Sequence, residues 1–180
     1  MDFVVRRQRG DDAAEVREVL TAAFADDGHV ADLADALRAR KDQQCSLVAV
    51  DDHDRIVGHV HLSASWVDAP TRLIEVLTLS PLGVAPASQR QGIGTALASE
   101  ALAAAEEVRA PLVFLEGDPR YYGRLGWRSA SELGFTRPSV RVPLAGFQAF
   151  PLASYDPAIM SGALVYNDTF WSHDCVGLRN

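Results

Sequence analysis

The feature that most constrains the fold is a long apolar stretch, Leu73–Val84, which runs through a short loop into an alanine-rich helix. Its many leucines and valines predict a central strand. Pro81 and Gly83 interrupt it and predict a bulge or a local break in pairing, because proline cannot donate to a sheet ladder. The following segment, Gly92–Val108, is rich in strong helix formers. A strand followed by a glycine-led helix predicts an α/β domain.

Two kinds of pattern predict the remaining elements. Short apolar or alternating runs predict strands at Phe3–Arg7, Ser46–Val50, Ile56–Leu62, Leu112–Leu115, Phe147–Leu152 and Ala163–Tyr166. Apolar residues at helical spacing predict helices after Asp11 or Asp12, at Val30–Arg40, and, begun by Pro119, at Tyr121–Leu125. Glu15 stands where a capping-box partner of Asp12 would stand. Strands separated by single helices predict a mixed sheet covered by helices.

Composition predicts one domain over residues 1–180, with residues 145–180 as a C-terminal extension of strands and loops. The chain has 180 residues, 48% of them hydrophobic, which suits a single buried core. Its net charge of −7 disfavours non-specific binding to nucleic acid or to anionic membranes. It has no apolar run near the about 20 residues of a membrane span and no signal segment. Cys45 and Cys175 form no CxxC pair, so we expect a cytoplasmic protein with two ordinary thiols.

The loop and helix start at Gln89–Thr95 predict an anion site. Backbone N–H groups at a helix start bind anions, Gly92 and Gly94 let a phosphate approach the backbone, and Arg90 adds positive charge. A pyrophosphate suits this arrangement. A Walker loop fits poorly because this segment contains no lysine, and a dinucleotide fingerprint fits poorly because its third glycine is missing. Taken alone, the two glycines are equally consistent with a purely structural helix start.

Two motifs in order identify a family resemblance. The segment Gln89-Arg90-Gln91-Gly92-Ile93-Gly94 resembles the Gln/Arg-x-x-Gly-x-Gly/Ala signature of the GNAT superfamily of N-acyltransferases, and Leu82-x-Val84-x-Pro86 precedes it as that signature's strand end. Tyr122-Gly-Arg-Leu-Gly126-Trp127 resembles the superfamily's Tyr-x-x-x-Gly-Phe segment. The longer stretch Gly117–Trp127 is similar to a bacterial subgroup of predicted N-acetyltransferases. The likeness spans roughly Phe3–Tyr166.

The resemblance implies both a fold and a donor. The fold is α/β (α+β), a mixed and mostly antiparallel central sheet flanked by helices and splayed between Leu73–Val84 and Leu112–Leu115. The donor is acetyl-CoA as co-substrate, with no metal, and a primary amine attacks its thioester directly. The residues that the resemblance assigns to acetyl-CoA are Leu82, Gly83, Val84, Gln89, Arg90, Gln91, Gly92, Ile93, Gly94 and Thr95.

The resemblance assigns Tyr122 as the general acid that protonates the departing thiolate; the alternative is that Tyr122 only packs on the acetyl arm. Relatives with a glutamate base carry it where this chain has Thr78. Glu75, three residues away, faces the opposite side of a strand. Glu116 and Asp118 stand near the end of the neighbouring strand, either as relays through water or as solvated carboxylates. An amine that is already neutral would require no base.

Several alternatives stay open. His59 and His61 share a strand face but lack a third metal ligand, so they are packing or surface histidines or line the acceptor site. A set of aromatic residues forms either core or an acceptor wall: Phe147, Phe150, Tyr155, Tyr166, Phe170 and Trp171. The acceptor is a small-molecule amine or a protein amine, and a homodimer is compatible with the family. The alternative functions are a non-catalytic acyl-CoA-binding or regulatory module and another phosphate-ligand protein.

Overall fold

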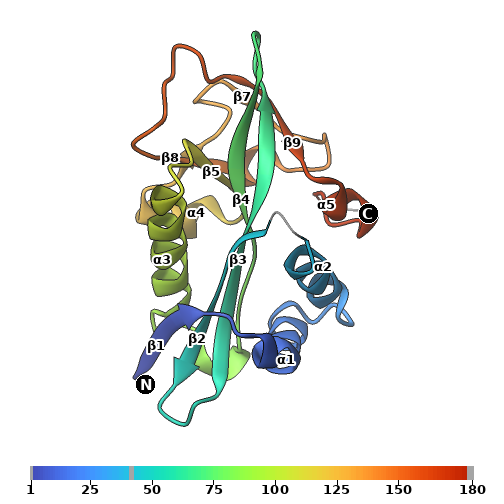
Figure 1. Ribbon diagram of the computed structural model, residues 1–180, viewed down its shortest axis with the longest axis vertical. Coiled ribbons are helices and arrows are strands. Elements are labelled where there is room, and N and C mark those ends of the chain that lie inside the picture. The colour runs from blue at the N-terminus through green and yellow to red at the C-terminus, as the bar shows by residue number, and fades with distance from the viewer. Residues whose placement is uncertain (1, 41–42, 178–180) are drawn as a thin grey trace. The chain divides into compact units, whose positions relative to one another are not determined.

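Figure 1 shows the computed structural model of the chain, which describes residues 2–40 and 43–177. The chain forms two compact units. The first comprises the chain up to Ser63 together with Leu79–Ala104, and the second comprises Ala64–Thr78 together with the chain from Ala105 onward. Two long strands contribute residues to both units.

Antiparallel strands form the sheet of the first unit. They are β1 (Phe3–Arg7), β2 (Gln43–Asp51), and the parts within this unit of β3 (Ile56–Asp68) and β4 (Leu73–Val84). β2 pairs with β1 on one side and with β3 on the other. The end of β4 lies beside the start of β3, where the N–H of Ala85 donates to the carbonyl of Val57 at 2.9 Å. The predicted bounds of β1 and β4 are confirmed, and β2 and β3 are longer than predicted.

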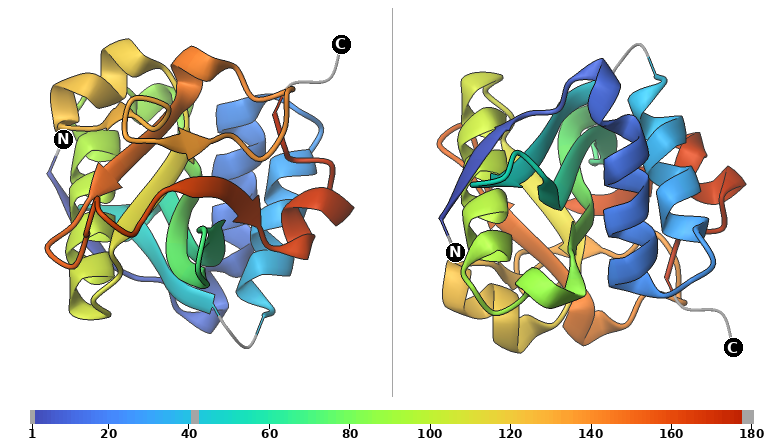
Figure 2. Two further views of the ribbon diagram at one scale, coloured as in Figure 1. Left: turned by 90° about the horizontal axis from the view of Figure 1, so that it is seen from above. Right: turned by 90° about the horizontal axis from the view of Figure 1, so that it is seen from below.

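Helices cover both faces of this sheet (Figure 2). Two of them, α1 (Ala13–Phe24) and α2 (His29–Arg38), lie on one face, and α3 (Ile93–Glu107) lies on the other. Two strand glycines allow the close approach. A Cβ at Gly58 would lie 2.9 Å from Cδ1 of Leu97 on α3, and one at Gly83 would lie 2.8 Å from Cδ2 of Leu20 on α1.

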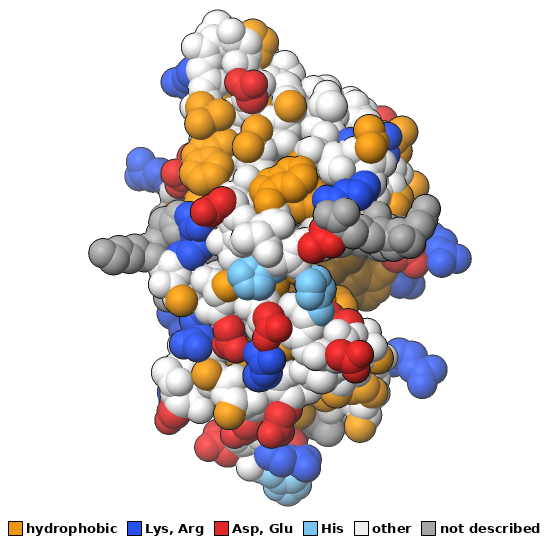
Figure 3. Space-filling view, turned by 90° about the vertical axis from the view of Figure 1, so that its right-hand side faces the viewer, with side chains coloured by type: hydrophobic (Ala, Val, Ile, Leu, Met, Phe, Trp, Pro, Cys, Tyr) orange, Lys and Arg blue, Asp and Glu red, His pale blue; other side chains and the backbone are white. Residues whose placement is uncertain are grey.

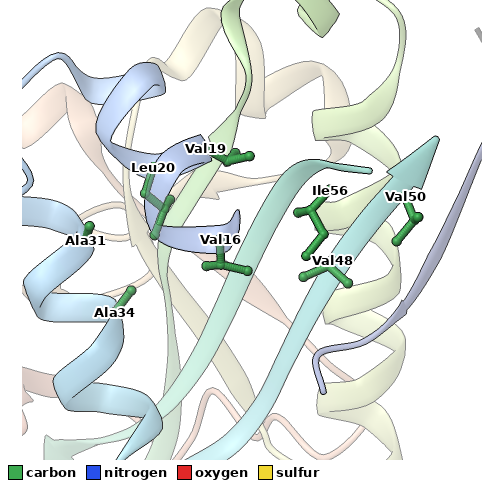
Figure 4. Close-up of a cluster of buried hydrophobic side chains, with 8 residues drawn as sticks. All are labelled: Val16, Val19, Leu20, Ala31, Ala34, Val48, Val50 and Ile56. Atoms are coloured by element: carbon green, nitrogen blue, oxygen red, sulfur yellow. The ribbon is translucent and has the colours of Figure 1, made fainter. Parts of the chain in front are cut away.

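The apolar stripe of α1 forms the core beneath these helices. Figure 4 shows its side chains with those of α2, β2 and β3: Val16, Val19, Leu20, Ala31, Ala34, Val48, Val50 and Ile56. All of them are buried. The apolar stripe that the sequence predicts for α1 comprises Val16, Val19, Leu20, Ala23 and Phe24. Its first three members are buried, as expected for an amphipathic helix, whereas Phe24 is exposed.

The capping box predicted for α1 is wrong. Asp12 belongs to a 3₁₀ turn, Gly10–Asp12, and its side chain accepts hydrogen bonds from the N–H of Arg9 at 2.6 Å and from the guanidinium of Arg6 at 2.6 and 2.9 Å. The Arg6 guanidinium holds the pKa of Asp12 below its usual value. Glu15 instead accepts from the N–H of Ile56, at the start of β3, at 3.1 Å. The two carboxylates of the predicted capping box therefore bond to Arg6, Arg9 and Ile56 instead of capping α1.

The second unit contains a parallel pair formed by two largely buried strands. β4 pairs with β5 (Leu112–Glu116), and the register pairs between them in the described residues are Leu77 with Val113 and Thr78 with Phe114. β5 continues to Glu116 beyond these pairs, as the predicted splay requires. Phe135–Thr136 also pairs in parallel, with Gly162–Tyr166, and the remaining register pairs among the described residues of this unit are antiparallel. The predicted mixed and mostly antiparallel sheet flanked by helices is confirmed.

The remaining elements of the second unit are short. β6 (Arg128–Ser129) pairs with β8 (Phe147–Pro151), which also pairs with β5. β7 (Phe135–Thr136) pairs with β9 (Gly162–Tyr166), which also pairs with β3. The helices of this unit are α4 (Pro119–Tyr122) and α5 (Asp168–Ser172), with 3₁₀ turns at Gly123–Leu125 and Leu144–Gly146. The sequence did not predict β6, β7 or α5. Pro119 begins α4 as predicted, and the helix predicted at Tyr121–Leu125 is found as the end of α4 and the 3₁₀ turn that follows it.

Aromatic rings fill the core of the second unit. Phe114 on β5 stacks on Phe147 at 5.8 Å and meets Phe135 edge-on at 5.0 Å. Phe147, Tyr166 and Phe170 are buried, whereas Trp171 is exposed.

Acidic and basic side chains are interspersed on the molecular face drawn in Figure 3. In the part of the chain that the structure describes, no helix is long and apolar enough to cross a bilayer.

Candidate active site

The loop between β4 and α3 in the first unit turns at two left-handed residues, Arg90 (φ 62°) and Gly92 (φ 88°). A Cβ at Gly92 would meet nothing within 4 Å, so the conformation, not the space, favours glycine. The first hydrogen bond of α3 runs from the N–H of Ala96 to the carbonyl of Gly92 at 3.0 Å. The N–H groups of Ile93 and Gly94 precede that bond, so they lie outside the helical ladder and suit an anion.

Packing and side-chain hydrogen bonds hold this loop in place. Ile93 is 1% exposed, and its Cγ2 would lie 3.0 Å from a Cβ at Gly58 on β3. The side-chain amide of Gln89 donates to the carbonyl of Val84 at 3.2 Å, and that of Gln91 donates to the carbonyl of Ala87 at 3.3 Å. The two glutamines of the motif therefore tie the loop to itself and to the end of β4.

The other residues assigned to acetyl-CoA surround this turn. Leu82 and Val84 are half-buried at the end of β4, and Gly83 between them is buried against α1. Arg90 and Thr95 are exposed. The exposed guanidinium of Arg90 lies one residue before the turn into α3, where it can add positive charge next to the helix N-terminus. All ten residues predicted for the donor therefore belong to one strand end, loop and first helical turn.

Tyr122, the predicted acid, lies in the second unit at the end of α4. Its ring packs against the backbone of Gly117, where an added Cβ would lie 2.4 Å from its Cε2. Tyr121 and Trp127 meet the ring edge-on, with centroids at 4.9 and 5.8 Å. Burial, and then Tyr121, raise the pKa of Tyr122 to about 12. This pKa keeps the hydroxyl protonated, and no hydrogen bond from it is found among the described residues.

The carboxylates near Tyr122 differ in their environments. Asp118 caps α4 by accepting from the N–H of Arg120 at 2.8 Å, and hydrogen bonds from the Arg120 side chain lower its pKa. Its role is to begin the helix that carries Tyr122. Glu75 is exposed on β4. Thr78 is fully buried, with its hydroxyl 2.8 Å from that of Ser65 on β3.

Glu116, at the end of β5, has the most unusual environment of these carboxylates. It is half-buried and accepts a hydrogen bond from the hydroxyl of Tyr166 at 2.9 Å. The N–H of Gly177 donates a second one. Burial raises the pKa of Glu116, and both hydrogen bonds oppose this rise. The sequence reading named Glu116 among several carboxylates but had no signal that singled it out.

His59 and His61 are buried within the first unit and are not surface residues. His59 Nε2 lies 2.9 Å from the hydroxyl of Ser46, and the two imidazole centroids are 6.4 Å apart. Burial lowers the pKa of His59 to about 3 and that of His61 to about 4, so both rings are neutral. Across the described ranges, no group of three His, Cys, Asp or Glu side chains is placed to hold a metal ion.

Comparison with known proteins agrees with this arrangement. The family model described as "Acetyltransferase (GNAT) domain" matches residues 4–130, which include both motifs. The chain belongs to the GNAT acetyltransferase family.

Individual relatives support the same family. A mycothiol acetyltransferase of Nocardia farcinica is 34% identical over 151 residues, which are 79% of this chain and 46% of the relative, so the chain spans about half of that protein's length. The structure resembles a GNAT family N-acetyltransferase (YhbS) of Escherichia coli in complex with CoA, with a TM-score of 0.85, 25% identity, and coverage of 93% of this chain and 91% of the other. It also resembles a GNAT family acetyltransferase of Brucella melitensis in complex with acetyl-CoA, with a TM-score of 0.75, 29% identity, and coverage of 94% and 98%.

Proposed function

We propose that this protein transfers the acetyl group of acetyl-CoA to a primary amine. The observation that supports the proposal is the start of α3, where Gly92 is left-handed and the N–H groups of Ile93 and Gly94 precede the first helical hydrogen bond. Such N–H groups suit an anion. Relatives of the same fold have been crystallised with CoA and with acetyl-CoA. A CoA pyrophosphate is the anion that suits a site of this kind in this family.

The reaction requires three proton movements besides the acyl transfer. An ammonium group loses a proton, and the neutral amine then attacks the thioester carbonyl carbon to form a C–N bond. The C–S bond breaks, the nitrogen loses its second proton, and the thiolate takes up one. The sum is R–NH₃⁺ plus acetyl-CoA giving R–NH–acetyl, CoA thiol and one proton.

Tyr122 is the proposed donor to the departing sulfur. A pKa of about 12 keeps it protonated at every working pH. A thiol has a reference pKa near 8.5, so complete transfer from this tyrosine to a free thiolate would be uphill. The role that this pKa suits is a hydrogen bond that strengthens as charge develops on sulfur, with the proton moving late.

The acceptor and the cellular setting are also proposals. The acceptor is a small-molecule amine or an amine of a protein, and a homodimer would be in keeping with the family. The curated relative is named for mycothiol, and this chain covers 46% of that protein. The chain has only two cysteines, Cys45 and Cys175, which is too few for a disulfide scaffold, so we propose a cytoplasmic location.

The test has two measurements. Acetyl-CoA is expected to raise the melting temperature more than ATP or NAD does, because a ligand specific for the folded state stabilises it by mass action. Thiol release from acetyl-CoA is then followed with glucosamine, spermidine and a lysine-containing peptide. Release that depends on an amine supports an acetyltransferase. Binding without release for any amine would instead favour a non-catalytic acyl-CoA-binding module.

A further inference from the structure

Strand register in the second unit places four polar side chains on one face of the sheet. Ser65 on β3 pairs with Tyr166 on β9, and residues directly paired across strands project to the same face. The hydroxyls of Ser65 and Thr78 are 2.8 Å apart, so Thr78 projects to that face as well. Thr78 pairs with Phe114 on β5, and Glu116 lies two residues further along the strand. Because side chains alternate along a strand, Glu116 shares the face with Thr78.

The β4 strand itself offers no base on this face. Thr78 is buried, and its hydroxyl is engaged by Ser65. Glu75 is exposed and three residues away, which reverses the face. The carboxylate that the register brings to this face is therefore Glu116, and Tyr166 extends from β9 to hold it.

The partners of Glu116 leave it incomplete. A carboxylate has about four acceptor positions. Two hydrogen bonds reach Glu116, one from the Tyr166 hydroxyl at 2.9 Å and one from the Gly177 N–H. No Lys, Arg or His of the described residues forms an ion pair with it. The nearby Arg141 is itself paired with Asp174 at 3.1 Å. Burial disfavours a charged carboxylate that lacks a cationic partner, and a bound ammonium group would supply that partner to the half-buried Glu116.

We infer that Glu116 binds the ammonium group of the acceptor and takes its proton, with Tyr166 as the positioning residue. This inference rests on the proposed function and deepens it, because it selects acceptors that arrive as cations. Tyr122, at the end of α4, packs on Gly117, the residue directly after Glu116.

The step balances as an acid–base exchange. The ammonium N–H bond breaks, its electron pair stays on nitrogen as the nucleophile, and the proton forms an O–H bond on Glu116. After acyl transfer, Glu116 releases that proton to water, which accounts for the one proton of the overall reaction. No oxidant, metal or further reactant takes part.

The inference has a pH signature because the carboxylate is the active form. The groups that face Glu116 are Tyr166, the Gly177 N–H, and Arg141 with its partner Asp174. Burial raises the pKa of Glu116, and the Tyr166 hydroxyl lowers it. Activity should therefore fall on the acid side as Glu116 becomes protonated. Removing the hydroxyl in Tyr166→Phe should raise that pKa and move the acid limb of kcat/KM to higher pH, with activity recovered in alkaline buffer.

The first experiment measures acetyl transfer to spermidine and glucosamine over pH 5–10. Glu116→Gln should lose about 10²–10⁴-fold in kcat/KM, the usual contribution of a general base. Its acid limb should move to higher pH and follow the deprotonation of the free amine. The matched control is Glu75→Gln, which neutralises an exposed carboxylate of the same unit and should keep both the rate and the profile. The second experiment measures binding of the same amines to the protein saturated with CoA, which cannot react. Glu116→Gln should weaken this binding at least tenfold.

The outcomes distinguish failure of the role of Glu116 from failure of the proposed acetyltransferase function. Thiol release by Glu116→Gln with an unchanged rate and pH profile would overturn the base and leave the acetyltransferase standing. If the wild-type protein releases no thiol with any amine, the proposed function fails. In that case, amine binding to the CoA-saturated protein tests the ammonium site. Weaker binding by Glu116→Gln, but not by Glu75→Gln, would support the site. Equal binding by the wild type and Glu116→Gln, or no binding by the wild type, would overturn it. A Tyr166→Phe profile without the alkaline shift overturns the positioning role.

Discussion

Gly117→Ala should displace the ring of Tyr122. A Cβ at this position would lie 2.4 Å from Cε2 and 2.7 Å from Cδ2 of Tyr122. Carbon atoms in contact are about 3.5–4.0 Å apart, so the ring would have to move by about 1 Å. Trp127 and Tyr121 pack edge-on to the ring and oppose that movement.

The expected losses of stability and of rate in Gly117→Ala follow from these contacts. Overpacking of this kind costs about 1–3 kcal/mol in the free energy of unfolding. For a protein of this size, each kcal/mol lowers the melting temperature by about 2–4 °C. A catalytic group misplaced by about 1 Å costs about 10²-fold in rate. We therefore expect a lower melting temperature and a kcat about 10²-fold lower, with the affinity for acetyl-CoA unchanged.

The matched control is Gly123→Ala, in the next turn. A Cβ at Gly123 would meet nothing within 4 Å, and its backbone is helical at φ −58° and ψ −33°. This substitution should keep the activity and stabilise the fold by about 0.4–1 kcal/mol. Both variants are measured by thermal unfolding, acetyl-CoA binding and thiol release with the amine that gives the fastest release.

A double-mutant cycle separates the clash from other effects. In a Tyr122→Ala background the ring is gone, so Gly117→Ala should lose most of its cost in stability. The reasoning would be refuted by an equal cost in both backgrounds. It would also be refuted by a Gly117→Ala protein as stable and as active as the wild type.

Three other predictions follow from the structure. Tyr122→Phe should lower kcat about 10²-fold or more at unchanged acetyl-CoA affinity; unchanged turnover at saturating acetyl-CoA would leave the ring as packing only. Gly92→Ala should cost about 1–2 kcal/mol, because an L-residue is strained at φ 88°, and weaken acetyl-CoA binding in titration calorimetry, whereas Gly10→Ala, in open space, should not. Asp12→Asn should destabilise the protein by about 1.5–3 kcal/mol in urea at pH 7, because Arg6 loses its charged partner. The pKa of Asp12 is lowered in the fold, so this difference is present above the unfolded pKa of about 3.9 and should vanish as the pH falls through the folded value; a difference that persists in acid would contradict it.

The sequence determined the features that depend on neighbours along the chain. The bounds of β1 and β4 were predicted as found, since apolar patterning alone specifies them. The turn before α3 was also predicted, because a residue held at a positive φ such as Gly92 is a local requirement. The order of the two motifs was enough to indicate the family that the comparison then showed.

The tertiary structure decided which distant groups meet. Asp12 and Glu15 bond to Arg6 and to the N–H of Ile56 instead of forming a cap, and β6 and β7 are two-residue strands that exist only through their partners. Glu116 and Tyr166 are separated by 50 positions in the chain and meet at 2.9 Å. No local pattern encodes such a contact, because it depends on strand register and on burial. The same burial sets the pKa values of Tyr122 and Glu116, and these determine the chemistry that the site can perform.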